Sequence, residues 1–307
     1  MKFHLITNCT NSKSSKAKKK IKFSDSIGKQ CVESHWLDSI YADSPSIKAI
    51  DLYVGDHWSN VKRLSEVCSE ISVVSAGYGL ISSEQLIHSY DATFSSNTEN
   101  SVGQIYDSKL LADRNRLWWN AIHRHNHYDV GPIYSLYKSV EPSIFVFALS
   151  PSYLKVVEPE LVALRKENIA TPDNTLIISS DAKIDDSLEK MFYRNSEDFC
   201  TELGGSRVSL NIRLAKFFIE RLNNNSAFST QAASIYKEIQ KRAKPATKFN
   251  RKKLTDEDVI LFIRDEIKVA GKAKFSASTL LKKLRDKGLA CEQKRFGSLY
   301  KQVVNSK

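Results

Sequence analysis

The sequence predicts an α/β fold, in which a mainly parallel sheet is layered with helices, followed by a small C-terminal all-helical basic module. Two observations predict the α/β part. Short apolar runs alternate with helical patterns over residues 1–225, and continuous apolar runs are typical of strands in a sheet that is covered on both faces. A third observation predicts the module: positive charge and three further helical patterns gather in the last quarter of the chain.

Strands are expected in five runs rich in β-branched residues: FHLIT (3–7), IKAIDLY (47–53), EISVVSA (70–76), SIFVFAL (143–149) and NTLIISS (174–180). Helices are expected in VKRLSEVCSE (61–70), YLKVVEPELVALRKE (153–167) and SLNIRLAKFFIERLNN (209–224). In parallel sheets ligands bind beyond the carboxyl ends of the strands. The polar residues that follow each strand are therefore the first candidates for a site.

The C-terminal quarter is strongly basic. Residues 226–307 hold 20 Lys and Arg against 8 Asp and Glu, whereas the rest of the chain is nearly neutral. This asymmetry indicates a phosphate-rich partner, because neutralising phosphates releases condensed counterions. We expect an α/β domain over 1–225 with an insert at 96–140, a basic linker over 226–253 and a helical module over 254–307.

Helix signals in the module include both caps and apolar spacing. Thr255 is expected to cap the first helix and Gly271 to end it. The second helix is expected to start at Ser276 or Ser278 and to end at Gly288. A third is expected in CEQKRFGSLYKQVV (291–304). Three short helices rich in Lys and Arg are typical of helix-turn-helix-type modules, so duplex DNA is the expected partner.

The composition favours a cytoplasmic protein. The chain has 307 residues, of which 41% are hydrophobic and 26% charged, and it has no apolar stretch of the roughly 18 residues that a membrane span needs. Its five cysteines are scattered without a CxxC pair, which favours reduced thiols. Walker, GxGxxG, HExxH and GxSxG motifs are absent, which disfavours nucleotide hydrolysis, dinucleotide redox chemistry and the common hydrolase classes. No cofactor is expected.

Three alternating histidines, His123, His125 and His127, follow the helical segment LWWNAI. They would share one face only in an extended segment, because a helix would spread them around its axis. Since no cysteine or carboxylate pattern completes a metal site, we expect a solvated loop and no metal.

Candidate site residues follow from the strand ends. Asn8 to Lys13 follow the first expected strand, and Asp56 and His57 follow the second. The third is followed by Ser75, Gly77, Tyr78, Glu84, Tyr90 and Asp91, and the fourth by Ser150. The diglycine in ELGGSRVSLNIR precedes Arg207 and Asn211 at a helix start, where an anion can bind. Hydroxyls and small residues at several strand ends suit a flat, polar ligand such as a nucleobase.

Three of these segments resemble a known group of proteins. LYVGDHWSNVKRL and ISVVSAGYGLISSEQLIHSYDATFS are similar to the YaaA-type peroxide-stress proteins. Thr7 to Lys13, Ser75 to Leu80 and Tyr90 to Thr93 are similar to a related bacterial family with Ser-Ala-x-Tyr-Gly-Leu. The resemblance covers about residues 1–95 closely and 140–220 loosely. DpdC-like proteins, which belong to clusters that place 7-deazaguanine bases in DNA, look like members of this group.

The DpdC-like resemblance implies a reaction on DNA, the conversion of a 7-cyano group on the base to a carboxamide, with other enzymes of the modification cluster as further partners. A thiolate can add to the nitrile carbon, and the lysines near Cys9 favour the thiolate. The expected catalytic residues are Cys9, Lys13, Asp56, Tyr78 and Asp91. The expected substrate-binding residues are Asn8, Ser75, Gly77, Glu84, Tyr90, Ser150, Arg207 and Asn211. The expected DNA-binding residues are Lys252, Lys253, Lys282, Lys283, Arg285, Lys294 and Arg295.

Each role has a structural alternative. Cys9 could be a small core residue, and Gly77 and Gly79 could serve a tight turn with positive φ. Asp56 and His57 could form a solvated helix start. The YaaA-type resemblance alone implies DNA binding and protection from oxidative damage, so a non-catalytic DNA-binding protein is the alternative function. An RNA partner is also compatible with the sequence.

Overall fold

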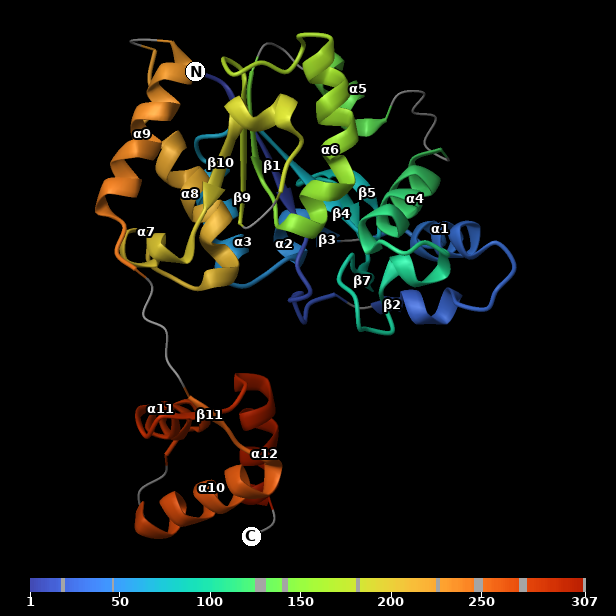
Figure 1. Cartoon of the computed structure of the whole chain (residues 1–307). Helices are drawn as coiled ribbons and strands as arrows, with labels where there is room; N and C mark the ends of the chain where they lie inside the picture. Colours follow the sequence, from blue (N-terminus) through green and yellow to red (C-terminus); the bar gives the residue numbers. More distant parts are fainter. Residues whose placement is uncertain are drawn as a thin grey trace. The chain divides into compact units, whose positions relative to one another are not determined.

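The computed structural model describes residues 1–17, 20–45, 47–124, 131–139, 143–180, 183–224, 227–245, 251–270 and 275–305. The chain divides into two compact units, Met1–Ala246 (unit 1) and Thr247–Lys307 (unit 2), and each has a hydrophobic core of its own. Figure 1 shows helices packed around a sheet in unit 1 and the helices α10 to α12 in unit 2.

Unit 1 is built on a six-stranded sheet with the strand order β10-β9-β8-β1-β4-β5. Its strands are β1 (Phe3–Asn8), β4 (Glu70–Ser75), β5 (Gly79–Ser82), β8 (Ile144–Ala148), β9 (Thr175–Ser180) and β10 (Phe192–Asn195). Neighbours pair in parallel except β4 and β5, which are antiparallel. At the centre Leu5 lies opposite Ile71 on one side and Val146 on the other. The predicted mainly parallel sheet is confirmed.

The strand order reverses at β1. From β1 the chain moves to β4 on one side, and it later returns to β8 on the other side and continues outward to β9 and β10. Because such crossovers are right-handed, α3 (Asp56–Leu64) and α6 (Pro151–Lys166) cover opposite faces of the sheet. The carboxyl ends of β1 and β8 therefore flank a topological switch point, where open α/β sheets bind their ligands.

The remaining layers pack on these two helices. The α8 helix (Leu210–Ile219) contacts α3 as well as β8 and β9, whereas α4 (Leu111–Arg124) and α5 (Pro132–Ser139) pack against α6 (Figure 1). The predicted helices at 153–167 and 209–224 are confirmed as α6 and α8, while the helix expected at 61–70 begins earlier, at Asp56, and ends at Leu64. In the described part of the chain, no helix has both the length and the apolar character needed to cross a membrane.

Four of the five predicted strands are confirmed, and the strand predicted over 47–53 is wrong. Only Ile47–Lys48 is extended, as β3, and the chain then forms a short helix, α2 (Ala49–Leu52). Its buried residues Ala49, Leu52 and Tyr53 recur at helical spacing, a pattern that the β-branched composition of the run conceals.

Several elements have no counterpart in the prediction. They are α1 (Val32–Tyr41), α7 (Cys200–Leu203), the two-stranded pairs formed by β2 (Lys20–Lys22) with β7 (Ser89–Asp91) and by β3 with β6 (Leu86–Ile87), and the 3-10 turns η1 (Phe23–Ser26), η2 (Val102–Ile105), η3 (Asp186–Met191), η4 (Glu197–Phe199) and η5 (Arg207–Ser209). Most are short, and short elements lack a clear periodicity.

The predicted linker over 226–253 contains a helix, α9 (Phe228–Arg242), that belongs to unit 1. Its residues Phe228, Ala232, Ile235 and Ile239 are buried in the core of unit 1 at i, i+4, i+7 and i+11. The domain boundary therefore lies about twenty residues later than predicted, near residue 246. The outer face of α9 is polar, so the overall composition of the segment does not reveal its apolar stripe.

Unit 2 has the three predicted helices, α10 (Asp256–Ala270), α11 (Ala277–Asp286) and α12 (Gln293–Asn305), with the strand pair β11 (Lys252–Lys253) and β12 (Leu289–Ala290). The Thr255 hydroxyl accepts the Asp258 N–H at 3.2 Å, and the Ser276 hydroxyl accepts the Thr279 N–H at 3.2 Å. Both predicted caps are thus confirmed, whereas Gly271 lies outside the described residues. Val259, Leu280, Leu284 and Phe296 are fully buried in the small core.

Candidate functional site

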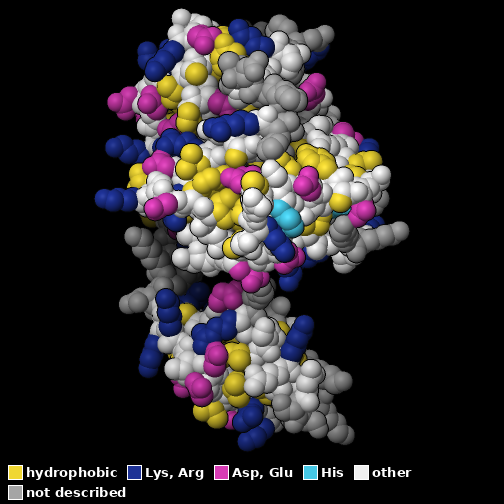
Figure 2. Space-filling view, turned by 90° about the vertical axis from the view of Figure 1, so that its right-hand side faces the viewer, with side chains coloured by type: hydrophobic (Ala, Val, Ile, Leu, Met, Phe, Trp, Pro, Cys, Tyr) yellow, Lys and Arg dark blue, Asp and Glu magenta, His cyan; other side chains and the backbone are white. Residues whose placement is uncertain are grey.

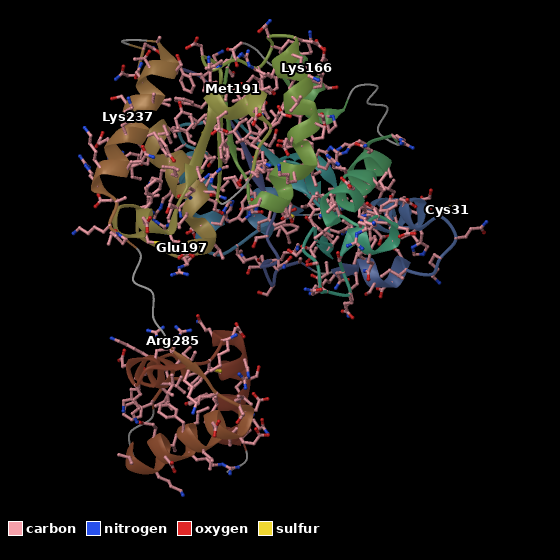
Figure 3. All side chains as sticks on the ribbon, in the orientation of Figure 1. Cys31, Lys166, Met191, Glu197, Lys237 and Arg285 are labelled. Carbon is pink, nitrogen blue, oxygen red and sulfur yellow. The ribbon has the colours of Figure 1, made fainter. Side chains whose placement is uncertain are left out.

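A pocket of about 620 Å³ opens at the carboxyl ends of β1, β8, β9 and β10. Met191 and Glu197, which flank β10, lie at opposite ends of the sheet in Figure 3, and Glu197 is at the pocket end. The lining consists of Asn8, Cys9, Thr10, Asn11, Ser12, His57, Thr93, Ser95, Ser150, Tyr153, Ser180, Asn195, Ser196, Glu197, Arg207, Val208, Leu210 and Asn211. Pockets of this size bind small-molecule ligands.

Two amide side chains join the strands around the pocket. The Asn8 amide oxygen accepts the Ser150 N–H at 3.0 Å, which ties the end of β1 to the end of β8 across the switch point. Asn211 donates to the Leu149 carbonyl at 2.8 Å, and its amide oxygen accepts from Asn195 at 3.0 Å. These bonds hold the pocket floor rigid, because each amide is fixed from two sides.

Cys9 presents the one thiol in the lining. Its side chain is buried, and its Sγ lies 3.1 Å from the Tyr153 hydroxyl. Burial and the adjacent Cys9 raise the pKa of Tyr153 well above its ordinary value, so this tyrosine keeps its proton at neutral pH. The protonated Tyr153 hydroxyl can donate a hydrogen bond to the sulfur or accept one from the thiol, and it can give a proton to a ligand bound there.

Lys13 and two tyrosines lie behind Cys9. The Lys13 ammonium is 4.3 Å from the centre of the Tyr90 ring and donates to the Thr10 carbonyl at 3.1 Å. Burial lowers the pKa of Lys13, while Cys9 and Asp91 partly oppose this shift. Tyr90 hydrogen-bonds to Tyr53 at 2.7 Å and to Ser75 at 2.6 Å. Neither Lys13 nor Tyr90 is part of the pocket lining.

His57 is the single imidazole in the lining. Its Nε2 lies 2.8 Å from the Thr7 hydroxyl, which itself donates to the Ala148 carbonyl at 3.1 Å. The hydroxyl has one proton, so Nε2 of His57 must be the donor in the first bond. Burial lowers the pKa of His57 to about 4. A neutral imidazole whose Nδ1 has no hydrogen-bond partner among the described residues can accept a proton from water.

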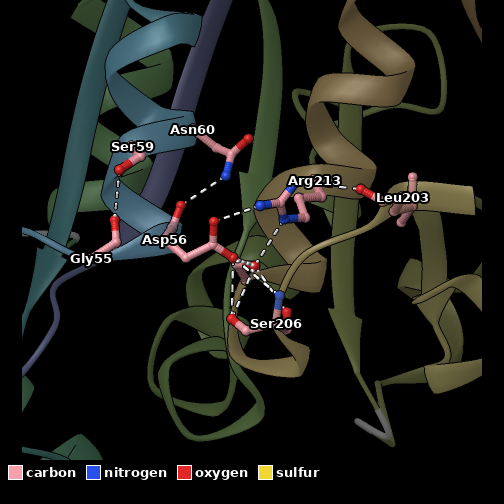
Figure 4. A network of polar contacts seen from close by, with 8 residues as sticks. Gly55, Asp56, Ser59, Asn60, Leu203, Ser206 and Arg213 are labelled. Carbon is pink, nitrogen blue, oxygen red and sulfur yellow. Dashed lines mark hydrogen bonds and ion pairs between the residues drawn. The ribbon is translucent and has the colours of Figure 1, made fainter. Parts of the chain in front are cut away.

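Asp56 is part of a network of polar contacts that acts as a clamp (Figure 4), and it is not part of the pocket lining. Its carboxylate accepts from the Ser206 N–H at 3.1 Å and from the Ser209 hydroxyl at 2.5 Å, and it pairs with Arg213 at 2.5 Å. The Ser209 hydrogen bond, with those of Ser206 and Arg213, holds the pKa of Asp56 far below its ordinary value. A carboxylate that stays ionised cannot carry protons near neutral pH, so the structure gives Asp56 a positioning role.

The Ser75–Leu80 turn is buried and its polar groups are satisfied within the protein. Ser75 accepts the Tyr78 N–H at 3.0 Å, and the Tyr78 hydroxyl accepts the His88 N–H at 2.9 Å. Gly77 needs the absence of a side chain, because a Cβ there would lie 2.6 Å from the Tyr90 ring. None of Ser75, Gly77 and Tyr78 lines the pocket. The positive φ expected of a tight turn is found at Gly79 (+76°) but not at Gly77, where the close Tyr90 ring is what requires a glycine.

Two predicted carboxylates are engaged elsewhere. Glu84 is exposed and pairs with Lys48 at 2.7 Å, and Asp91 pairs with Lys20 at 2.7 Å. Neither lines the pocket. The structure therefore gathers Asn8, Cys9, Ser150, Arg207 and Asn211 from the predicted set, and it leaves the other predicted residues of unit 1 behind the pocket or away from it.

His123 is buried, so the expected solvated loop is wrong at this residue. It lies in α4, accepts the Leu80 N–H at Nε2 at 3.0 Å, and donates from Nδ1 to the Trp119 carbonyl at 2.7 Å. Burial lowers its pKa to about 4. His125 and His127 lie outside the described residues. Among the described residues, no cluster of His, Cys, Asp or Glu could hold a metal ion.

The pocket also contains residues that the sequence did not single out as site residues. Thr93 comes from the loop after β7, Ser180 ends β9, and Asn195 ends β10. The end of the correctly predicted strand at 174–180 was a usable signal for Ser180. For Asn195 the signal was weak, because the strand FYRN has four residues and no strong apolar run.

The basic residues of unit 2 fall into two groups. Lys283 pairs with Glu266 at 3.1 Å, and Arg295 pairs with Asp256 at 2.5 Å. Lys282 and Arg285 instead lie with Arg251 and Ser278 around a hollow of about 210 Å³ on α11. In Figure 2, Lys and Arg side chains are spread over the visible face of this unit with acidic side chains between them. Lys252 and Lys253 are exposed, and the Lys294 side chain lies outside what the structure describes.

Comparison of the chain with protein-family models, with curated proteins and with solved structures found no match.

Proposed function

We propose that this protein is a DNA-modifying enzyme that hydrates the 7-cyano group of a 7-deazaguanine base to a carboxamide, with Cys9 as the nucleophile. One observation carries the proposal: Cys9 places a thiol beside a protonated tyrosine in a polar pocket at the switch point of the sheet. The DpdC-like resemblance supplies the substrate, and unit 2 supplies the expected contact with DNA.

The contacts around Cys9 support this choice of residues. Two segments that carry the resemblance, 7–13 and 90–93, come together here, since Lys13 lies over Tyr90 and Thr93 shares the pocket lining with Cys9. The third, 75–80, supports Tyr90 from behind through Ser75. The three segments therefore form one structural unit around the thiol.

The proposed reaction consumes one water and involves no oxidation or reduction. The Cys9 sulfur adds to the nitrile carbon while Tyr153 gives its proton to the nitrile nitrogen and takes up the thiol proton, and a thioimidate results. Water then adds to the same carbon, and His57 accepts one of its protons and gives that proton to the nitrogen, which becomes NH2. The carbon–sulfur bond breaks as the carbonyl forms, the hydroxyl proton passes to the Cys9 sulfur, and the carboxamide leaves.

The test measures nucleosides after incubation of the full chain with duplex DNA that contains the 7-cyano base. We expect the base to gain the mass of one water in the wild type, and Cys9→Ala to slow conversion by about a thousandfold or more. Cys68→Ala is the matched control, because Cys68 is also buried but lies outside the pocket. It should convert the base at the wild-type rate.

Two results would contradict the proposal. One is unchanged conversion by Cys9→Ala. The other is binding of DNA by the wild type without any change in its nucleosides, which would favour the non-catalytic DNA-binding protein.

A further inference from the structure

Val208 is an apolar side chain exposed at the mouth of the pocket. It is 84% exposed although it belongs to the pocket lining, while its neighbours Ser209 and Leu210 are buried. Single exposed apolar residues are common on protein surfaces. The position of Val208 is unusual, because the rest of the pocket is lined mainly by amides, hydroxyls and charged groups.

The segment that presents Val208 is held firmly. Residues on both sides of it, Ser206 and Ser209, are bound to the Asp56 carboxylate, and Arg213 binds both that carboxylate and the Ser209 hydroxyl at 3.0 Å (Figure 4). Gly205 has a φ of +72°, and a Cβ there would lie 2.2 Å from the Arg213 guanidinium. The clamp therefore fixes an exposed valine at the pocket mouth instead of letting it fold inward.

Arg207, the preceding residue, adds positive charge at the same place. Its guanidinium pairs with Glu197 at 2.9 Å, and the two side chains are 60% and 50% exposed. Such exposed pairs contribute little to stability, so a phosphate can replace the Glu197 carboxylate at low cost. The pocket mouth thus presents an apolar group next to an arginine that can bind phosphate.

The depth of Cys9 imposes a condition on any DNA substrate. Cys9 is 5% exposed and lies inside the pocket, so a base stacked in a duplex cannot bring its nitrile to the sulfur. Enzymes that act on such bases extrude them from the stack, and apolar side chains inserted between base steps stabilise the opened duplex.

We propose that Val208 is the wedge that fills the space left in the duplex when the target base enters the pocket, and that Arg207 binds the adjacent phosphate. This inference rests on the proposed action on a base in DNA, but it concerns how the base is brought out and is independent of the chemistry at Cys9.

The experiment compares Val208→Ser with Val67→Ser, a control because Val67 is also exposed, at 55%, but lies outside the pocket. Each full-length variant is given the 7-cyano base in a duplex and in a single strand of the same sequence. We expect Val208→Ser to slow conversion of the duplex at least about tenfold more than conversion of the single strand, since a single strand needs no wedge. The control should match the wild type on both.

A second measurement separates this inference from the proposed chemistry. A fluorescent purine analogue placed opposite or beside the target base brightens when the stack opens, whether or not a reaction follows. We expect the wild type and Cys9→Ala to raise its fluorescence in duplex DNA, and Val208→Ser to raise it much less. Equal slowing of Val208→Ser on both substrates, or no loss of the fluorescence change, would overturn the wedge.

Discussion

Buried histidines give this protein a specific dependence on pH. His4 and His123 are 0% and 3% exposed. His4 bonds to Ser72 at 2.8 Å, and His123 bonds to Leu80 and Trp119. Burial lowers the pKa of each to about 4, whereas an unfolded histidine has a pKa of about 6.5. Both rings are therefore neutral in the folded protein at neutral pH.

The consequence is a loss of stability in mild acid. Between about pH 6.5 and pH 4 the unfolded chain binds protons that the folded chain does not, so the unfolding free energy falls as the pH is lowered, by up to about 3 kcal/mol for each histidine. Urea unfolding across this range measures the slope. His123→Gln should flatten the slope. An unaltered slope in His123→Gln would contradict the assignment of His123 to this effect.

Among the elements, the contact between α3 and α8 depends on one carboxylate. Asp56 begins α3 and binds Ser206 and Ser209 just before α8, and Arg213 within α8. Because the pKa of Asp56 is lowered in the folded state, its contribution is fully present above the unfolded pKa of about 4 and is lost as the pH falls below it.

We expect Asp56→Asn to reduce the unfolding free energy at neutral pH by about 2 kcal/mol, because Arg213 loses its charged partner and is only 19% exposed. Asp51→Asn is the control. Asp51 is 62% exposed and lies 3.7 Å from Lys62, so its loss should cost less than about 1 kcal/mol. Chemical denaturation measures both. Equal effects would show that the clamp adds no more than a surface ion pair.

The two units of the molecule carry different charge. Unit 2 holds 16 Lys and Arg against 7 Asp and Glu, which is most of the excess positive charge of the chain. Its separate core of Val259, Leu280, Leu284 and Phe296 gives this charge a folded scaffold. We therefore propose that unit 2 binds the phosphates of DNA and that unit 1 acts on the base.

On unit 2 we expect Lys282→Gln combined with Arg285→Gln to weaken DNA binding and to reduce the slope of log affinity against log salt by about 2, because two phosphate contacts are lost. Lys283→Gln combined with Lys287→Gln removes the same charge, but both lysines are paired with Glu266, so the change should be smaller. Titrations at several salt concentrations measure both slopes. Equal losses would mean that total charge, and not the hollow on α11, governs binding.

Local sequence patterns were sufficient to predict much of the secondary structure of this protein. The strands at β1, β4, β8 and β9, the helices α6 and α8 and the three helices of unit 2 follow from apolar spacing and caps, because these depend on neighbours within a few residues. The rule that ligands bind at strand ends selected Asn8, Cys9 and Ser150, and the helix start after the diglycine selected Arg207 and Asn211. All five line one pocket.

The remaining features depend on contacts between distant parts of the chain. The sequence predicts that Asp56 carries protons. In the structure its carboxylate is instead bound by Ser206, Ser209 and Arg213, some 150 residues away, and it clamps these segments together. Tyr153 meets Cys9 across 144 positions, and α9 joins unit 1 through buried residues on one face. No local periodicity encodes which side chains meet, because packing of the sheet and its two helical layers sets those distances.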